Sequence, residues 1–482
     1  MIRASPVRRI GSAGFGPEAA DLASMTRLCL AALTCLAVAA PQVPANEVPV
    51  DHWVLRGTVV GADSVIEDAA VSIQGQKIES VGPWSPPGAG VRVVETHGFI
   101  YPGLIDLHNH LTWNVFPRWS AGRTFPNRYE WQQFAPYLMA LDTPHRLMIE
   151  QGYGTRMAKY AEVKALAGGV TSLAGLHPGD LPKGTASSYH QMVRMIDLCS
   201  GFYPPGAPET VAYQVFPLFM VEPLAAKYRT ELTNHQLKAL LIHLGEGSPV
   251  DAASINEYRI LKARGLLLPG VSLIHGVALH RAQFEEMRSL GIGLIWSPRS
   301  NFELYGATAD IGAAKAAGVT IAIAPDWSPT GSDGLLGELK YAATWNAAQP
   351  TPPFDDRALF RMATSEPARL AGADDKIGAL KAGLYADILV LARARPDGYA
   401  ALDHASPADV NLVVVSGQAV YGDDALAKAA RPDTAWTRIQ VGSAAKSVAF
   451  PSAAPGDDWA HTTAALDAEL TTLGSHLSPL VE

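Results

Sequence analysis

The middle of the chain repeats one pattern, a short apolar run followed by a stretch long enough for a helix. After "PGLIDLHNH" come the runs "GVTSLAGL", "VAYQVFPLF", "ALLIHLGEG", "VSLIHGVAL", "GIGLIWSP" and "VTIAIAPDW". Strands that alternate with helices build a parallel sheet covered on both faces. So many units in succession predict an α/β fold with a (β/α)8 TIM barrel, for which 482 residues and 48% hydrophobic side chains supply enough core.

The third strand of this barrel has the weakest signal and is expected near "RMIDLCSGF". An open doubly wound sheet is the alternative architecture. The sequence contains neither a Gly-rich dinucleotide fingerprint nor a phosphate-binding loop that would support it. We therefore expect the closed barrel.

Strand-like runs with glycine turns lie on both sides of the barrel, as in "WVLRGTVVG" and "VVVSGQAVYG". The two flanks predict one small β-sandwich built from both ends of the chain. The expected organisation is an N-terminal extension with a signal peptide (1–45), the first part of the sandwich (46–98), the barrel (99–372), the second part of the sandwich (373–430) and a C-terminal extension (431–482).

Residues 25–45 have the composition of an export signal. A basic Arg27 precedes an apolar stretch from Leu28 to Ala40, and Val43-Pro44-Ala45 suits signal peptidase. The apolar stretch is shorter than the roughly 20 residues of a membrane-spanning helix. We expect cleavage after Ala45, a periplasmic or secreted protein and no stable membrane insertion.

The charge balance excludes one class of partner. Lysine and arginine number 38 and aspartate and glutamate 46, which gives a formal net charge of −8. No basic run interleaved with aromatic residues is present, so a nucleic-acid partner is not expected. The expected partner is a small-molecule substrate, and a homo-oligomer is compatible with the sequence.

Histidines follow the first strand two positions apart. Alternate residues of a strand share a face, so Asp106, His108 and His110 point the same way, towards the mouth of a barrel. A lone H-x-H pair is weak support for a metal site. His243, His275 and Asp326 close three later strands, and ligand-type residues at the ends of several strands predict one shared site.

Each of these residues also has an ordinary interpretation. His243 could be a core histidine, His275 a residue at a helix N-terminus, and Asp326 a helix cap. Glu246 follows His243 by three residues, where it could reach a metal-held water or lie solvated in a loop. The set taken together favours the metal site.

The chain resembles the amidohydrolase superfamily, in the mononuclear branch that contains cytosine deaminase, triazine hydrolases and imidazolonepropionase. The resemblance runs from His52 to about Asp424 and rests on "PGLIDLHNH", "GGVTS", "HLGE", "HG", "SPRSN" and "APDWSPTGS". It implies His108, His110, His243 and Asp326 as metal ligands, and Glu246, His275 and Asp326 as catalytic residues.

The resemblance also implies one divalent metal ion. Zinc is the expected metal, with iron or manganese as alternatives. Binuclear relatives carry a bridging lysine or glutamate on strand four, and "VAYQVFPLF" offers neither. Lys164 and Glu222 lie near enough in the sequence to leave a second metal open.

The loop after the first strand is rich in aromatic residues and arginine, as the walls of a substrate site often are. Its arginines could bind a substrate carboxylate, and a packed loop with solvated arginines is the alternative. The candidate substrate contacts, taken from this loop and from the ends of later strands, are Trp113, Arg118, His177, Arg299 and Trp327.

These expectations give one leading function and two alternatives. The leading function is metal-dependent hydrolysis of a C–N bond in a cyclic or linear amide, or deamination of an aminated heterocycle. Export favours amide cleavage slightly. The alternatives are an exported dipeptidase or acyl-amino-acid hydrolase on the same fold, and a binding protein without metal or catalysis.

Overall fold

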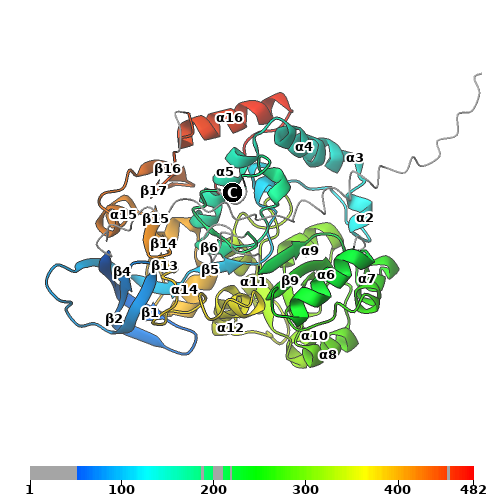
Figure 1. The fold of residues 1–482 in the computed structure, drawn as a ribbon, viewed down its shortest axis with the longest axis horizontal. Helices are drawn as coiled ribbons and strands as arrows, with labels where there is room; N and C mark the ends of the chain where they lie inside the picture. The colour runs from blue at the N-terminus through cyan, green and yellow to red at the C-terminus, as the bar shows by residue number, and fades with distance from the viewer. Residues whose placement is uncertain (1–50, 186–188, 199–209, 218–219, 453–455, 482) are drawn as a thin grey trace, which may run out of the picture.

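The computed structural model describes residues 51–185, 189–198, 210–217, 220–452 and 456–481. The expected signal peptide lies outside the described residues. Within them, parallel sheets form the middle of the chain and a larger sheet combines its two flanks (Figure 1). No helix in the described ranges combines the length and apolarity needed to cross a bilayer.

Eight strands lie in two parallel sheets of orders β5-β6-β7 and β12-β11-β10-β9-β8. Each falls within a run expected to be a strand, including the third. The strands are β5 (Leu104–Asp106), β6 (Val170–Leu173), β7 (Arg194–Met195), β8 (Val211–Gln214), β9 (Ala239–Leu244), β10 (Val271–His275), β11 (Gly293–Trp296) and β12 (Ile321–Ile323).

The two parallel sheets meet at the carboxyl ends of β5 and β12. Asn109 and Asp326 form a parallel bridge. The Asp326 N–H donates to the His108 carbonyl at 3.0 Å, and the His110 N–H donates to the Asp326 carbonyl at 3.0 Å. We call these residues the β5–β12 seam. No strand pairing joins β7 to β8 among the described residues, so the pairing by itself does not demonstrate the expected closed barrel.

Helices follow most of these strands, and Figure 1 shows α6, α7, α8 and α10 gathered around the five-stranded sheet. Asp310 starts α10 by accepting the Ala313 N–H, and Gly318 ends it in the left-handed conformation. The helices of this region are α5 (Gly154–Ala167), α6 (Glu222–Thr233), α7 (Ala252–Ala263), α8 (Arg281–Leu290), α9 (Pro298–Tyr305), α10 (Ile311–Ala317), α11 (Leu335–Ala347), α12 (Asp356–Ala363) and α13 (Ser365–Leu370).

The long segment after β5 forms short helices rather than one irregular loop. It contains α2 (Arg128–Trp131), α3 (Ala135–Tyr137) and α4 (Thr143–Glu150). The Asn127 side chain caps α2 by accepting the Glu130 N–H. This segment therefore has a defined structure where it borders the carboxyl ends of the strands.

The two flanks of the chain share one nine-stranded sheet of order β16-β17-β15-β14-β13-β4-β1-β2-β3. Its strands are β1 (His52–Val60), β2 (Val65–Gln74), β3 (Lys77–Pro83), β4 (Arg92–Pro102), β13 (Ile388–Leu391), β14 (Val410–Val415), β15 (Gln418–Gly422), β16 (Thr437–Val441) and β17 (Ala444–Val448). β13 pairs with β4 edge to edge, from Ile388↔Pro102 to Leu391↔Phe99. The flanks therefore meet as predicted, but the two layers of the expected sandwich are not shown by this pairing.

The C-terminal residues contribute to both parts of the molecule. β16 and β17 extend the nine-stranded sheet. Along the chain they follow α14 (Gly398–His404) and α15 (Asp424–Ala430). Beyond them, α16 (Trp459–Thr472) lies near α5, where Tyr160 and Trp459 stack with ring centroids 5.4 Å apart. The C-terminal extension expected from the sequence therefore packs against the helix that precedes β6.

Candidate metal centre

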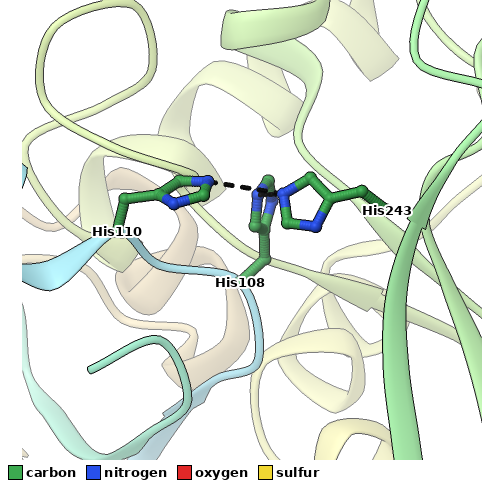
Figure 2. A group of neighbouring side chains, drawn as sticks. All are labelled: His108, His110 and His243. Carbon is green, nitrogen blue, oxygen red and sulfur yellow. Dashed lines mark hydrogen bonds between the residues drawn. The ribbon is translucent and has the colours of Figure 1, made fainter. Parts of the chain in front are cut away.

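Four ligand-type side chains converge where β5, β9 and β12 end. The Nε2 atom of His243 lies 3.0 Å from that of His108 and 3.3 Å from that of His110. Figure 2 shows the three imidazoles pointing towards one another from two different segments. Asp326 Oδ1 lies 3.1 Å from His108 Nε2 and 3.4 Å from His110 Nε2. Three nitrogens and one oxygen therefore face a common point.

The imidazoles are held in the neutral form that binds a metal. Burial lowers the pKa of His108 to about 3 and that of His110 to about 4, and it lowers the pKa of His243 well below its ordinary value. His243 Nδ1 lies 3.1 Å from the Gln214 carbonyl, which can only accept a hydrogen bond. Its Nε2 therefore carries the lone pair.

Lone pairs that face one another at this spacing repel unless a cation lies between them. His108 Nδ1 lies 2.7 Å from the Ser297 hydroxyl, which leaves its Nε2 directed at the cluster. Histidine nitrogens and a carboxylate oxygen are the donor set that divalent cations such as Zn²⁺ prefer. The donor set of this site thus fits a divalent metal.

Asp106 does not join the cluster, although it shares a strand face with His108. Its Oδ1 accepts the His108 N–H at 3.0 Å, and its Oδ2 accepts the Asn109 side-chain amide at 2.7 Å. Burial raises its pKa to about 8. This carboxyl group holds the backbone that carries the histidines.

Two of the site residues have strained backbones. Asp326 has a φ of 69° and His275 a φ of 71°, in a region that non-glycine residues rarely adopt. Asp326 Oδ2 accepts the Ser300 hydroxyl at 2.5 Å, while Oδ1 faces the histidines. Burial raises the pKa of Asp326. Two of the six non-glycine residues with positive φ in the described chain therefore belong to the site.

Glu246 lies beyond the end of β9 with its two oxygens in different surroundings. Tyr305 donates to Oε1 at 2.6 Å, and Oε2 lies 3.0 Å from Arg128 Nη1. Burial alone would raise the pKa of Glu246, but Arg128 and then His275, with the Tyr305 hydrogen bond, lower it. Within the described chain Oε2 accepts no hydrogen bond, so this oxygen is open to proton exchange.

His275 completes the group. Its Nδ1 lies 2.9 Å from the Asn301 amide oxygen, which fixes the proton on Nδ1, and its Nε2 lies 3.6 Å from Glu246 Oε2. Potential ligand atoms of His108, His275 and Asp326 lie within 4.8 Å of one another, as do those of His243, Glu246 and His275. The structure thus brings together every predicted ligand and catalytic residue.

Two of the five candidate substrate contacts border the centre. The Trp327 ring lies edge-on to His110 with centroids 5.9 Å apart. Trp113 packs edge-on to Trp327 at 5.5 Å and stacks on His145 at 3.8 Å. These rings form an aromatic wall beside the histidines.

The other three candidates are engaged elsewhere. Arg118 Nη1 donates to the Gly331 carbonyl at 2.8 Å. His177 Nδ1 accepts the Gly179 N–H at 3.1 Å as the cap of a short helical turn, and its side chain is 62% exposed. Arg299 contacts Glu338 through its backbone N–H, which donates to Oε1 at 2.9 Å, and this contact does not involve its guanidinium. Their contact with a substrate stays a prediction.

Sequence reasoning did not single out Tyr305, Tyr213 or the specific role of Arg128. Asn301 and Tyr305 lie four residues apart on α9, so they share a helix face, and this spacing could have revealed Tyr305. Tyr213 donates to the Asn109 carbonyl at 3.0 Å, with its ring 5.6 Å from that of His243. Arg128 gave no signal that separates it from the other arginines of its loop.

The residues that left a second metal open lie apart from the cluster. Lys164 Nζ pairs with Asp333 at 2.7 Å and donates to Ser478 Oγ at 2.8 Å. Glu222 is exposed and pairs with Arg229. In the described ranges, Glu222 belongs to no group of His, Cys, Asp and Glu side chains that could hold a metal ion.

Known proteins share this fold. Atrazine chlorohydrolase TrzN from Arthrobacter aurescens, complexed with zinc, aligns with a TM-score of 0.60 and 20% identity, covering 86% of this chain and 99% of its own. An adenosine deaminase from Xanthomonas campestris with bound zinc aligns with a TM-score of 0.58 and 18% identity, covering 79% and 97%. At these identities the likeness shows the fold alone.

Sequence relatives extend the comparison. The 5-methylthioadenosine/S-adenosylhomocysteine deaminase of Syntrophobacter fumaroxidans is 24% identical over 395 residues, which is 74% of this chain and 89% of the relative. The sequence model of the amidohydrolase family matches residues 140–421, more than half of the chain. The chain therefore belongs to the amidohydrolase family.

Proposed function

We propose that the protein is a zinc-dependent hydrolase of C–N bonds that removes an amino group from an aminated heterocycle. The observation that carries the proposal is the convergence of His108, His110, His243 and Asp326 on one point, with Glu246 Oε2 beside it. Relatives named as deaminases of methylthioadenosine and 5'-deoxyadenosine favour deamination over cleavage of a linear amide. This choice reverses the slight preference for amide cleavage that export had suggested.

A closed (β/α)8 barrel is the architecture we propose for the catalytic part. Ile105 of β5, Val211 of β8 and Ile274 of β10 belong to one buried apolar cluster, so both parallel sheets enclose the same core. The β5–β12 seam joins the sheets on one side. We also propose that the nine-stranded sheet folds into the two layers of a small β-sandwich.

The chemistry combines a bound cation with a proton carrier of the chain. A divalent cation lowers the pKa of water from about 15.7 to near 7 and polarises the bond under attack. Glu246 Oε2 accepts the proton of the attacking water and returns it to the departing nitrogen. Tyr305 fixes the other oxygen, so the carboxylate presents one oxygen to both steps.

His275 and Asp326 orient the reacting groups. The Nδ1 proton of His275 is bound by Asn301, so its Nε2 is the atom that faces the reacting water or the substrate. Asp326 Oδ2 is bound by Ser300, which directs Oδ1 at the centre. We propose Trp327, which lies edge-on to His110, and the neighbouring Trp113 as the apolar wall against which a heterocyclic ring packs.

Metal removal and a substrate panel test this function. The protein is stripped with a chelator, reloaded with zinc, and assayed on aminated purines and pyrimidines, linear amides and dipeptides. We expect zinc-dependent release of ammonia from an aminated heterocycle. Release of an amino acid would instead support the dipeptidase alternative, and a purified protein that neither binds metal nor turns over any substrate would support the non-catalytic one.

We further propose that the protein is exported through the segment from Met25 to Ala45. The basic residue, apolar stretch and small-residue exit in the sequence support this localisation. Expression of the full chain with detection of N-terminal processing and of protein in the periplasm or medium would test it. Unprocessed protein retained in the cytoplasm would contradict it.

A further inference from the structure

The short helix α2 contacts the turn that carries Glu246. The Arg128 guanidinium lies 3.0 Å from Glu246 Oε2, and the Arg128 backbone N–H donates to the Glu246 carbonyl at 3.2 Å. Both side chains are buried, at 1% and 3% exposure. One residue of α2 therefore contacts both the backbone and the carboxylate of Glu246.

The next residue on the same face of α2 reaches the other carboxylate oxygen. Trp131 follows Arg128 by three positions, and its Nε1 donates to the Tyr305 hydroxyl at 2.8 Å. Tyr305 in turn donates to Glu246 Oε1 at 2.6 Å. The helix thus restrains Oε2 through Arg128 and Oε1 through Tyr305.

The backbone around Glu246 is tied to the same segment. Tyr129 donates to Glu257, whose other oxygen accepts the Gly245 N–H at 2.6 Å. Asn127 forms an antiparallel bridge with Gly247. The residues on both sides of Glu246 are therefore held by α2 and its cap.

The geometry of the Arg128–Glu246 pair differs from that of a purely structural pair. Arg194 and Asp387, also buried, make two hydrogen bonds at 3.1 and 2.9 Å. In the described part of the chain, Glu246 Oε2 and Arg128 Nη1 and Nε make none. A pair kept for stability gains from such bonds, since they offset the cost of burying its charges. In this pair, the Arg128 guanidinium lies beside Glu246 Oε2, but Oε2 accepts no hydrogen bond within the described chain.

We propose that α2 is a positioning element for the proton carrier, with Arg128 as the positioning residue that holds Glu246 Oε2 at the metal centre. The inference rests on the proposed function, in which Glu246 moves the proton. It assigns the segment after β5 a second role, because this segment also carries Trp113 of the aromatic wall. Arg128 is consequently unavailable for the substrate carboxylate that the sequence had allowed for the arginines of this loop.

Substitution of Arg128 tests the proposal, with Arg259 as the control. Arg259 lies on α7, outside the loop after β5, and is exposed. For Arg128→Met we expect kcat to fall about 10- to 100-fold, with KM and zinc content within about twofold of the parent. Arg128→Lys restores part of kcat because it returns the charge without the planar guanidinium. Arg259→Met leaves kcat unchanged. An unchanged kcat in Arg128→Met would overturn the proposal.

A double-mutant cycle separates positioning from general destabilisation. If Arg128 acts through Glu246, Arg128→Met has little further effect on kcat in a Glu246→Gln background. Equal losses of kcat in both backgrounds would overturn the proposal. The same cycle on unfolding midpoints of the metal-free proteins, and a crystal structure of Arg128→Met, need no substrate. The positioning role would be refuted if the two substitutions had additive effects on the unfolding midpoint and the Glu246 carboxylate did not move. Failure of the whole substrate panel would refute only the proposed function.

Discussion

Each carboxylate of the centre uses its two oxygens differently. Tyr305 binds one oxygen of Glu246, and Ser300 binds one oxygen of Asp326. The remaining oxygen in each case faces the histidines. A hydroxyl donor therefore fixes the rotation of each carboxylate, and the oxygen that takes part in chemistry or metal binding is defined before any ligand arrives.

Glu246→Gln separates proton transfer from metal binding. The amide keeps the size of the side chain and can still accept from Tyr305, but it cannot exchange a proton. We expect kcat to fall about 10²- to 10⁴-fold with full zinc occupancy. Metal analysis and steady-state kinetics on the same preparation check this. Loss of zinc in the variant would mean that Glu246 is a ligand instead.

Zinc binding should release few protons between pH 5.5 and 7.5. An exposed imidazole has a pKa of about 6.5, so it is mostly protonated at pH 5.5 and competes with the metal. Burial lowers the pKa of His108 to about 3 and of His110 to about 4, so both are already neutral there. Among the four ligands, Asp326 is the one whose pKa burial raises, so any proton that the ligands release comes from this carboxyl group.

Calorimetry in buffers of different ionisation enthalpy counts these protons. Below about pH 6.5, where a bound water with a pKa near 7 keeps its proton, we expect about one proton or fewer per zinc ion and a slope of log Kd against pH no steeper than about one. A slope approaching three would show that the histidines are protonated in the metal-free protein. Asp326→Glu serves as the control, because it keeps a carboxyl group at this position and should release the same number of protons.

Between elements, a chain of amides connects the loops after β5 and β12. Asn109 donates to Asp106 at 2.7 Å, and Asn114 donates to Asn109 at 2.8 Å. Asn114 Oδ1 accepts the Ser328 N–H at 2.8 Å. Because His108 and His110 lie on one of these loops and Asp326 on the other, the amides set the spacing of the ligands without contacting the metal.

Asn114→Ala should therefore weaken zinc binding about 10- to 100-fold, as loss of a group that orients metal ligands commonly does. Asn346→Ala is the matched control, since Asn346 is also a buried asparagine that binds backbone on both sides, at the Phe354 carbonyl and N–H. Competition with a chelator of known affinity measures both variants. Equal zinc affinities in the two would contradict the assigned role of Asn114.

The strands and the residues at their ends could be anticipated because apolar periodicity and the position of a polar residue are local properties. His243 lies in β9, His275 ends β10, and Asp326 lies three residues beyond β12. The contacts of Arg128 and His177 could not, since they depend on how a loop turns after its strand ends. His177 caps its own turn, and Arg128 reaches Glu246 only because α2 folds back over it.

For the molecule as a whole, Lys164 joins three distant segments. It lies in α5, pairs with Asp333 before α11 and contacts Ser478 near the C-terminus. Lys164→Met leaves Asp333 without its buried cation and should lower the free energy of unfolding by about 3 kcal/mol. Zinc content should stay at one ion per chain. A drop in metal content would instead identify Lys164 as a ligand and restore the binuclear alternative.

The division of the chain into parts was predictable only in outline. Strand signals at Trp53 and Val413 revealed that both flanks form β-structure. They could not reveal that β13 pairs with β4. Two short sheets bury the same residues whether they join edge to edge or pack face to face. The backbone pairing from Ile388 to Leu391 decides this point, and it is a long-range contact that no local pattern encodes.

The β5–β12 seam links the lifetime of the bound cation to local opening of the fold. There Asp326 accepts the His110 N–H and donates its own N–H to the His108 carbonyl. All three residues also supply donor atoms, so opening the seam separates the donors at the same moment. The dissociation rate of the cation then cannot exceed the opening rate that hydrogen exchange reports for these two amides. A metal centre built on a closure of this kind exchanges its ion only as often as the two strands part.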